Sequence, residues 1–313
     1  MASSTLVETG EPTREVRWIR LAADIILAGL CGLPSLIMLL FVRPHQRGYF
    51  CNDATLSYPY VDGSIPTQMM AIIGFAIAIA VITYCEIMRV VFWESPNRPA
   101  PLPYRKVTYH IGQRNIHRVF IRLYKFIGYF TLGAAFSMMF VDVTKYTAGR
   151  LRPHFYAVCQ PVPVGAPNCS LTDGERYIRD YVCTGSHTYS AHRLKEVHLS
   201  FYSGHSSFAF YTAMYVMLYL QARVRSVAIF LSPVLVPIVQ LFVFVLAMFS
   251  AILNEIEHHH HWSDVLLGVI MGSLIALIVA CFIAKMFHQE KTETVVRRVS
   301  VHRQEVGSLI DKV

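Results

Sequence analysis

Hydrophobic residues gather in six long runs along this chain of 313 residues, with polar segments between them. The runs cover residues 25–42, 62–86, 126–141, 205–222, 227–250 and 265–284. Each is close to the ~20 residues that a helix needs to cross the apolar core of a bilayer. The pattern therefore predicts an all-α integral membrane protein in which six transmembrane helices form a bundle.

The composition of the chain agrees with a membrane protein. Charged residues make up 15% of the chain and hydrophobic residues 54%, whereas a soluble domain carries about 25% charged residues. We therefore divide the chain into a polar N-terminal tail (1–17), a six-span membrane domain (18–287) and a charged C-terminal tail (288–313).

Lysine and arginine residues indicate which side of the membrane each connection faces. They concentrate before the first run, in the second-to-third and fourth-to-fifth connections, and after the sixth run. Basic flanks favour the cytoplasmic side, so both tails are predicted to be cytoplasmic and the other three connections to face the lumen or the outside. The net charge of +8 follows from this topology. Because the basic residues form no single patch, we expect no nucleic-acid partner.

The predicted outer connections also hold a glycosylation sequon and four of the seven cysteines. The sequon is Asn168-Cys-Ser, and the cysteines are Cys51, Cys159, Cys169 and Cys183. Both features suit a compartment outside the cytosol, where glycans are attached and disulfides persist. Four cysteines allow three pairings, and the sequence does not choose among them.

The connection after the third run begins with the segment KYTAGRLRPHF. Lys145 and Arg152 are seven residues apart, so on a continuous helix they share one face about 10 Å apart, before Pro153 redirects the chain. Two cations on one face suit a doubly charged phosphate. The alternative is a pair of interfacial side chains that extend to the lipid headgroups.

The same connection ends with FYSGHSSFAFY, which has the features of a helix N-terminus. Ser203 is predicted to cap the helix, and Gly204 to let a ligand approach the backbone. The free amides at such a helix start attract anions. His205, on the first turn, is then expected beside the bound anion.

The connection before the sixth run contains EIEHHHHWSD, with four consecutive histidines. If this segment is helical, His260 (i−4) and His261 (i−3) both face Asp264. A carboxylate beside one ring nitrogen raises the basicity of the other, as a nucleophilic histidine requires. His260 is the first candidate and His261 the second, while His258 and His259 are predicted to be bystanders. A zinc site is the alternative, but adjacent histidines on a helix point about 100° apart and cannot converge on one ion.

Together, these motifs resemble the lipid phosphate phosphatases of the type-2 phosphatidate phosphatase superfamily. The first family motif, KxxxxxxRP, is matched by Lys145, Arg152 and Pro153, and the second appears as YSGH. The third, SRxxxxxHxxxD, is matched at His260 and Asp264. The resemblance covers all six runs and implies an active site at the extracytoplasmic ends of helices 3, 4 and 6.

The resemblance implies dephosphorylation of lipid phosphate monoesters through a phosphohistidine. His260 would attack phosphorus, Asp264 would orient it, and His205 would protonate the leaving alkoxide. The residues implied to hold the phosphate are Lys145, Arg152, Ser203 and Gly204. The implied substrates are phosphatidate, lysophosphatidate, sphingosine 1-phosphate and ceramide 1-phosphate, and neither magnesium nor another cofactor would be needed. We expect the plasma membrane, with an internal membrane as the alternative, and a homo-oligomer is an open question.

The chain departs from the third motif at Leu253 and Asn254, where the family has serine and arginine. Asn254 is then the expected phosphate contact at this position, but an amide donates a neutral hydrogen bond rather than a charged pair. Losing one such transition-state contact costs about 2–4 kcal/mol. His258, His259 and Arg150 are candidates to compensate for this loss.

Two hypotheses follow from this departure. The first is an active lipid phosphate phosphatase with reduced rate or narrow specificity. The second is a catalytically impaired relative that binds phospholipid or acts through protein partners. The retention of the other six side chains favours the first: Lys145, Arg152, Ser203, His205, His260 and Asp264.

Overall fold

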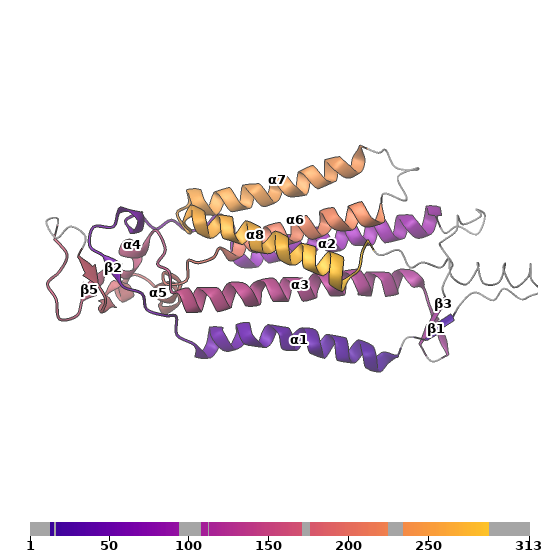
Figure 1. Cartoon of the computed structure of the whole chain (residues 1–313), viewed down its shortest axis with the longest axis horizontal. Helices are drawn as coiled ribbons and strands as arrows, with labels where there is room; N and C mark the ends of the chain where they lie inside the picture. The colour runs from indigo at the N-terminus through magenta and orange to yellow at the C-terminus, as the bar shows by residue number, and fades with distance from the viewer. Residues whose placement is uncertain are drawn as a thin grey trace, which may run out of the picture.

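The computed structural model describes residues 13–15, 17–93, 108–111, 113–170, 176–224 and 234–287. Within these ranges, six long helices run side by side (Figure 1): α1 (Trp18–Phe41), α2 (Thr67–Met88), α3 (Arg118–Ala148), α6 (Gly204–Arg223), α7 (Leu235–Ile256) and α8 (Trp262–Ile278). Short π-helical segments extend α2 (η2, Arg89–Trp93) and α8 (η4, Val279–Ile283). The predicted C-terminal tail, most of the N-terminal tail and the start of the fifth run lie outside the described residues.

Five of these helices are long and apolar enough to cross a membrane: α1, α2, α3, α7 and α8. The helix α6 is the exception, since its sequence contains several serines and tyrosines. It lies inside the bundle, packed against α2, α3, α7 and α8, and the hydroxyls of Tyr211 and Tyr215 donate to backbone carbonyls of α3. A helix surrounded by other helices has little contact with lipid, so it does not need an apolar exterior.

Two glycines bring α8 directly against α6. A Cβ added at Gly272 would lie 2.1 Å from the Ser207 carbonyl oxygen, and one added at Gly268 would lie 2.7 Å from the Ser203 carbonyl oxygen. The two backbones are therefore in contact over a full turn, as small residues allow between membrane helices. This packing places the N-termini of α6 and α8 next to each other.

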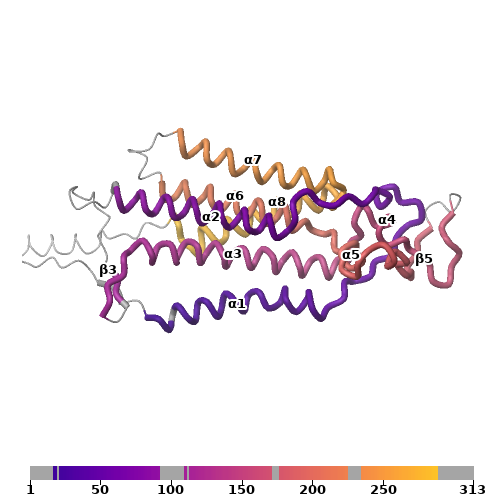
Figure 2. Tube along the Cα trace, turned by 180° about the vertical axis from the view of Figure 1, so that it is seen from behind, coloured from indigo at the N-terminus to yellow at the C-terminus, as the bar shows by residue number. Residues whose placement is uncertain are grey.

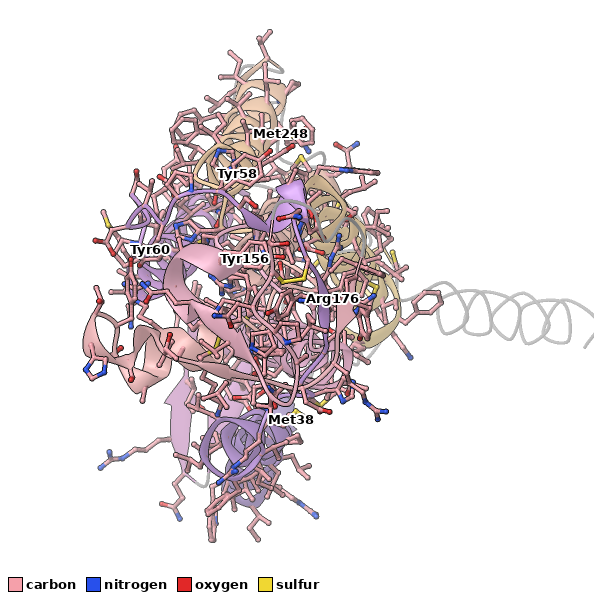
Figure 3. The ribbon with its side chains drawn as sticks, turned by 90° about the vertical axis from the view of Figure 1, so that its left-hand side faces the viewer. Met38, Tyr58, Tyr60, Tyr156, Arg176 and Met248 are labelled. Carbon is pink, nitrogen blue, oxygen red and sulfur yellow. A yellow bond between two sulfur atoms is a disulfide. The ribbon has the colours of Figure 1, made fainter. Side chains whose placement is uncertain are left out.

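The connections at one end of the bundle fold into a small unit, which we call the cap (the described parts of 42–66 and 149–203; Figure 2). It contains the helices α4 (Phe155–Cys159) and α5 (Ala191–Glu196) and the short turns η1 (Ala54–Leu56) and η3 (Gly185–His187). Two antiparallel strand pairs complete it, β2 (Tyr49–Phe50) with β6 (Tyr177–Ile178) and β5 (Pro161–Pro163) with β7 (Tyr181–Cys183). Figure 3 looks onto this end, where the labelled Tyr58, Tyr60, Tyr156 and Arg176 belong to the cap. At the opposite end, β1 (Thr13–Glu15), β3 (Thr108–Ile111) and β4 (Arg114–Ile116) form a small sheet.

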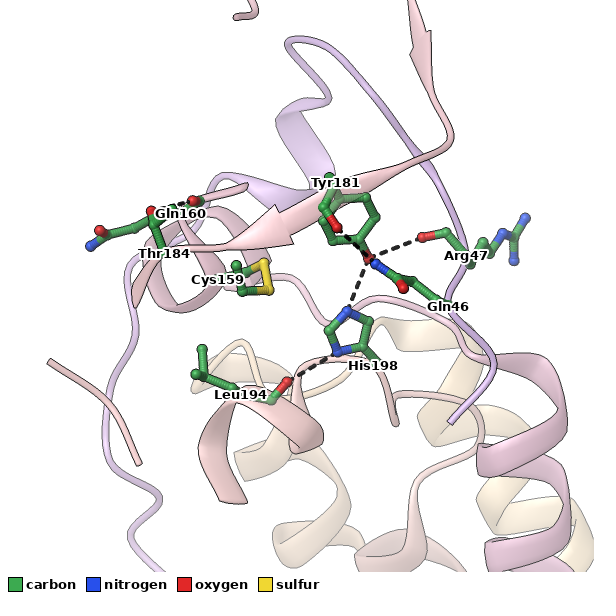
Figure 4. Close-up of a disulfide and its surroundings, with 9 residues drawn as sticks. Gln46, Arg47, Cys159, Gln160, Tyr181, Thr184, Leu194 and His198 are labelled. Carbon is green, nitrogen blue, oxygen red and sulfur yellow. Dashed lines mark hydrogen bonds between the residues drawn. A yellow bond between two sulfur atoms is a disulfide. The ribbon is translucent and has the colours of Figure 1, made fainter. Parts of the chain in front are cut away.

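Two disulfides hold the cap and settle the cysteine pairing that the sequence leaves open. Cys51 pairs with Cys169, which joins the connection before α2 to the one after α3. Cys159 pairs with Cys183, which joins α4 to β7 (Figure 4). Beside this second bond, the hydroxyl of Tyr181 donates to a backbone carbonyl 3.1 Å away. The cap therefore has its own covalent and apolar core, independent of the packing between the long helices.

Candidate functional site

The helix α3 carries Lys145 but ends before Arg152. It terminates at Gly149, whose φ of +56° is left-handed, and a Cβ there would lie 2.0 Å from the His45 carbonyl oxygen. A glycine is required at such a position, and it ends the helix. The expectation that Lys145 and Arg152 share one face of a continuous helix is therefore wrong. Arg152 instead lies beyond the end of α3, with its N–H donating to the Val197 carbonyl at 2.9 Å.

The charges of Lys145 and Arg152 nevertheless act on the same residue, His260. The Nζ of Lys145 lies 3.7 Å from where a Cβ on Gly204 would be, so this ammonium group faces the start of α6. The Nε of Arg152 is buried and has no hydrogen-bond partner among the described residues. Both charges lower the pKa of His260. The change of direction at Gly149 therefore leaves both charges near His260, although Lys145 and Arg152 do not share a helix.

The start of α6 has the geometry of an anion site. Ser203 is its N-cap, as predicted, and the Ser203 hydroxyl accepts the Ser206 N–H at 3.4 Å. Within the described parts of the chain, the amides of Gly204 and His205 donate no hydrogen bond. Unpaired amides at a helix start carry partial positive charge. Together with Lys145, they form a positively charged cradle for an anion.

His260 lies in the turn before α8, so the helical spacing from which it was chosen does not apply. The helix begins at Trp262, and His261 is its N-cap, with the His261 N–H donating to Asp264 at 3.2 Å. The Asp264 carboxylate therefore pairs with His261 as a helix cap, which is a common use of an acid at the third helical position. The Nδ1 of His260 lies 3.9 Å from Asp264, beyond hydrogen-bond distance.

The hydrogen bond of His260 determines which of its ring nitrogens carries the proton. Its Nδ1 lies 2.8 Å from the carbonyl oxygen of Ser200. A carbonyl accepts but cannot donate, so Nδ1 carries the proton and Nε2 keeps the free electron pair. Burial lowers the pKa of His260 well below its usual value, and the charges of Arg152 and Lys145 lower it further. The ring is therefore neutral and nucleophilic at Nε2.

Ser200 and Arg150 are site residues that the sequence analysis did not identify in these roles. The Ser200 hydroxyl donates to Asp264 at 2.6 Å, while the Ser200 carbonyl holds His260, so Asp264 acts on His260 through Ser200. Arg150 donates to the other oxygen of Asp264 and to Ser263. Both of these bonds come from the same terminal nitrogen of the guanidinium. These contacts join residues more than 60 positions apart, which no local spacing reveals.

Asn254 lies in the last turn of α7 and is buried. Its side-chain Nδ2 donates to the Ser250 backbone carbonyl of the same helix at 2.7 Å. The backbone carbonyl of Asn254 accepts the His259 N–H at 3.1 Å. One of the two amide hydrogens is therefore used within α7. This leaves at most one neutral donor at the position where the third motif has an arginine.

Burial lowers the pKa of four histidines outside the long helices, His154, His198, His259 and His260, and His154 shows the consequence for stability. Burial, followed by the charge of Arg152, lowers the pKa of His154 to about 3. In the unfolded chain a histidine has a pKa of about 6.5. Below pH 6.5 the unfolded state therefore binds a proton that the folded state refuses, and stability falls until the pH reaches about 3.

We accordingly expect acid to destabilise the protein in part through His154. At pH 5, the loss from this residue is about 2 kcal/mol relative to pH 7.5. The variant His154→Gln keeps a donor for the His258 carbonyl, which His154 Nδ1 contacts at 3.0 Å, but does not titrate. Thermal unfolding at the two pH values should show a smaller acid loss in the variant. Equal losses would contradict the assignment.

No group of three or more metal-binding side chains is arranged to hold an ion in the described parts of the chain. The four consecutive histidines explain why: His258 stacks on Tyr58, His260 is bonded to Ser200 and His261 caps α8. The zinc alternative therefore gains no support from the geometry.

Comparison with known proteins agrees with this arrangement. Residues 126–287, which include most of α3 and all of α6, α7 and α8, match the PAP2 superfamily. The chain belongs to this superfamily. A phospholipid phosphatase 1 of Rattus norvegicus is 35% identical over 84% of each chain, and a phospholipid phosphatase 2 of Homo sapiens is 31% identical over 94% of this chain and 92% of its own. No solved structure matches the chain significantly.

A further relative extends this comparison to an insect protein. A putative phosphatidate phosphatase of Drosophila melanogaster is 34% identical over 89% of this chain and 72% of its own. This PAP2-superfamily chain is thus homologous to phospholipid phosphatases over most of its length. The cap and the long helices both fall within the matched lengths, so the relationship is not limited to the apolar segments.

Proposed function

We propose that this PAP2-superfamily protein hydrolyses lipid phosphate monoesters through a phosphohistidine on His260. The observation that carries the proposal is the convergence of a neutral histidine, two cations and the start of α6 at one end of a membrane bundle. Lys145 faces the Gly204 backbone, and Arg152 influences His260. This is the equipment for nucleophilic attack on phosphorus with charge stabilisation of the transition state.

The proposed reaction has two steps. The Nε2 of His260 attacks phosphorus, the bond from phosphorus to the lipid oxygen breaks, and His205, protonated when the phosphate is bound, donates a proton to the leaving alkoxide. Water then attacks the phosphohistidine, His205 takes a proton from that water, and phosphate leaves from Nε2. Lys145, Arg152 and the Gly204 amide stabilise the phosphate charge throughout, so magnesium is not needed. Ser203 and Asn254 complete the proposed phosphate-binding set, although the structure occupies part of their hydrogen-bonding capacity.

The proposed substrates are phosphatidate, lysophosphatidate, sphingosine 1-phosphate and ceramide 1-phosphate. The names of the relatives, phospholipid phosphatase and putative phosphatidate phosphatase, support this class. The position of the candidate site supports it as well, because the end of a membrane bundle lies at the level of lipid headgroups. Roles in phospholipid metabolism and lipid signalling are part of the proposal.

We further propose six spans, with α6 as the fourth, both tails in the cytoplasm and the cap on the extracytoplasmic side of the plasma membrane or an internal membrane. The side is supported by the distribution of basic residues and by two disulfides in the cap. Asn168 is exposed and adjacent to the Cys51–Cys169 bond, so the sequon is accessible for glycosylation.

The activity is tested with purified protein and radiolabelled phosphatidate in detergent micelles containing a chelator. Phosphate release above the rate of a His260→Ala blank is the expected result. If the wild type releases no more phosphate than the blank from any of the four proposed lipids, the proposed function is wrong.

The second candidate function is a catalytically impaired relative, and Asn254 is the observation that favours it. The variant Asn254→Arg restores the residue that the third motif has at this position. If the wild type is an active phosphatase, we expect the turnover of Asn254→Arg to exceed that of the wild type by no more than about 10-fold. Restoring an indispensable transition-state contact would raise turnover by more, about 10²- to 10³-fold. Turnover on phosphatidate measures this. A silent wild type with an active Asn254→Arg variant would support the impaired relative instead.

A further inference from the structure

His259 is buried beside the proposed active site without a hydrogen bond. Its exposed fraction is 8%, and neither ring nitrogen has a hydrogen-bond partner among the described residues. A buried imidazole usually satisfies at least one ring nitrogen, because an unpaired polar group in the interior costs about 1–3 kcal/mol. The side chain is therefore arranged for a partner that the described residues do not supply.

The carboxylate of Glu257 lies on one side of the His259 ring. Its Nε2 lies 3.7 Å from Glu257 Oε2, and the other oxygen of Glu257 accepts the Ser64 N–H at 3.0 Å. A Cβ added at Gly63 would lie 3.0 Å from the same Nε2, so the wall on this side is closed. The remaining nitrogen, Nδ1, is then the atom available to a ligand.

The other charges around His259 indicate an anionic ligand. Burial lowers the pKa of His259, and the charges of Arg152 and Arg193 lower it further, whereas Glu257 and Glu196 oppose this. His259 in turn interacts electrostatically with His205 and with His260. The ring thus belongs to the cluster in which the buried Nε of Arg152 also has no described hydrogen-bond partner. A phosphate would supply acceptors for both groups and favour the charged form of His259.

The other candidate residues already make contacts elsewhere. The His258 ring stacks on Tyr58 with centroids 4.0 Å apart, and Arg150 is bound to Asp264 and Ser263. The amide of Asn254 donates to Ser250. Among the three candidates to compensate for the missing arginine, the geometry therefore distinguishes His259.

We propose that His259 is a substrate-binding residue whose charged imidazole donates from Nδ1 to the phosphate, with the Glu257 carboxylate 3.7 Å from Nε2. The residue that precedes the nucleophile in the chain thereby supplies the cationic contact that Asn254 cannot make. This inference rests on the proposed function, since it assigns a further residue to the same phosphate site. It changes His259 from a predicted bystander into part of the binding site.

The test is the affinity of purified full-length protein for inorganic phosphate, measured by protection from thermal unfolding and by competitive inhibition of phosphatidate hydrolysis. Loss of one charge-assisted hydrogen bond is worth about 1.5–3 kcal/mol, so His259→Ala should bind phosphate about 10- to 100-fold more weakly. His259→Arg should keep affinity within about 3-fold of the wild type, because it restores a cationic donor. The matched control is His258→Asn, which changes the adjacent histidine at a left-handed position (φ +54°) that asparagine tolerates.

The outcomes separate this inference from the proposed function. Weaker phosphate binding in His259→Ala, with unchanged binding in His258→Asn and His259→Arg, supports it. Equal affinity of wild type and His259→Ala overturns it, even if the enzyme is active. If His259→Ala does not fold, His259→Gln and His259→Arg are compared instead. Equally weakened phosphate binding in these two variants would overturn the need for a charge on this side chain. A wild type that binds phosphate but hydrolyses no lipid would reject the proposed function alone, because the binding assay does not require turnover.

Discussion

His260→Ala is expected to abolish phosphatase activity, with turnover reduced by roughly 10⁴- to 10⁶-fold, as for the loss of other covalent nucleophiles. The physical reason is that Nε2 of His260 is the neutral, unprotonated nitrogen, fixed by the bond from Nδ1 to the Ser200 carbonyl. Rapid quenching with phosphate-labelled substrate should trap an acid-labile, alkali-stable phosphoprotein in the wild type and none in the variant.

The control for His260→Ala addresses its neighbour. His261 was the second candidate for the nucleophile, but it is the N-cap of α8 and its ring Nδ1 lies 3.3 Å from the Asp264 carboxylate, a contact that alanine removes. His261→Ala should therefore lower stability by about 0.5–2 kcal/mol, as the loss of other N-caps does, and still form the phosphoprotein. A labelled His260→Ala protein, or an unlabelled His261→Ala protein that remains folded, would show that the nucleophile is misassigned.

Gly272→Leu is expected to prevent the bundle from assembling. A Cβ at this position would lie 2.1 Å from the Ser207 carbonyl oxygen and 3.0 Å from the Tyr211 nitrogen, both backbone atoms of α6. Neither atom can move without displacing the whole helix. Overpacking of a well-packed interior costs about 1–3 kcal/mol even for small additions, so Gly272→Ala should lower the melting temperature and Gly272→Leu should leave little folded protein.

The same displacement should also reduce activity at a distance. The start of α6 carries Ser203 and His205, and the start of α8 carries Asp264, so separating the helices opens the site. The matched control is Gly128→Ala in α3, where an added Cβ meets nothing within 4 Å; it should leave melting and turnover unchanged. Thermal unfolding and phosphatidate hydrolysis measure both effects. Wild-type values for Gly272→Ala would contradict the close packing of α6 and α8.

The sequence was informative where the chemistry is local. Apolar runs predicted the long helices, because burying a backbone in lipid requires about 20 apolar residues in a row. The Ser-Gly pair predicted the N-terminus of α6, because capping depends on residues three positions apart. The motifs also identified the superfamily to which the chain belongs.

Spacing arguments were less successful at helix ends. Lys145 and Arg152 were placed on one face, but Gly149 ends α3 between them. His260 was chosen by its helical distance to Asp264, yet it lies before α8 begins. In both cases the spacing rule assumed a continuous helix, but one residue of each pair lies outside the helix that holds the other. Helix boundaries also depend on contacts with other segments, such as the contact of Gly149 with His45.

What the sequence determined by itself is the class of protein, its long helices and the residue types available for the chemistry, since these depend on composition and local order. The tertiary structure decided the contacts: the disulfide pairs, the route from Asp264 through Ser200 to His260, and the unpaired His259 beside Arg152. These depend on how α6, α8 and the cap pack together. Short-range patterns carry no information on such contacts, because their partners are joined through space rather than along the chain.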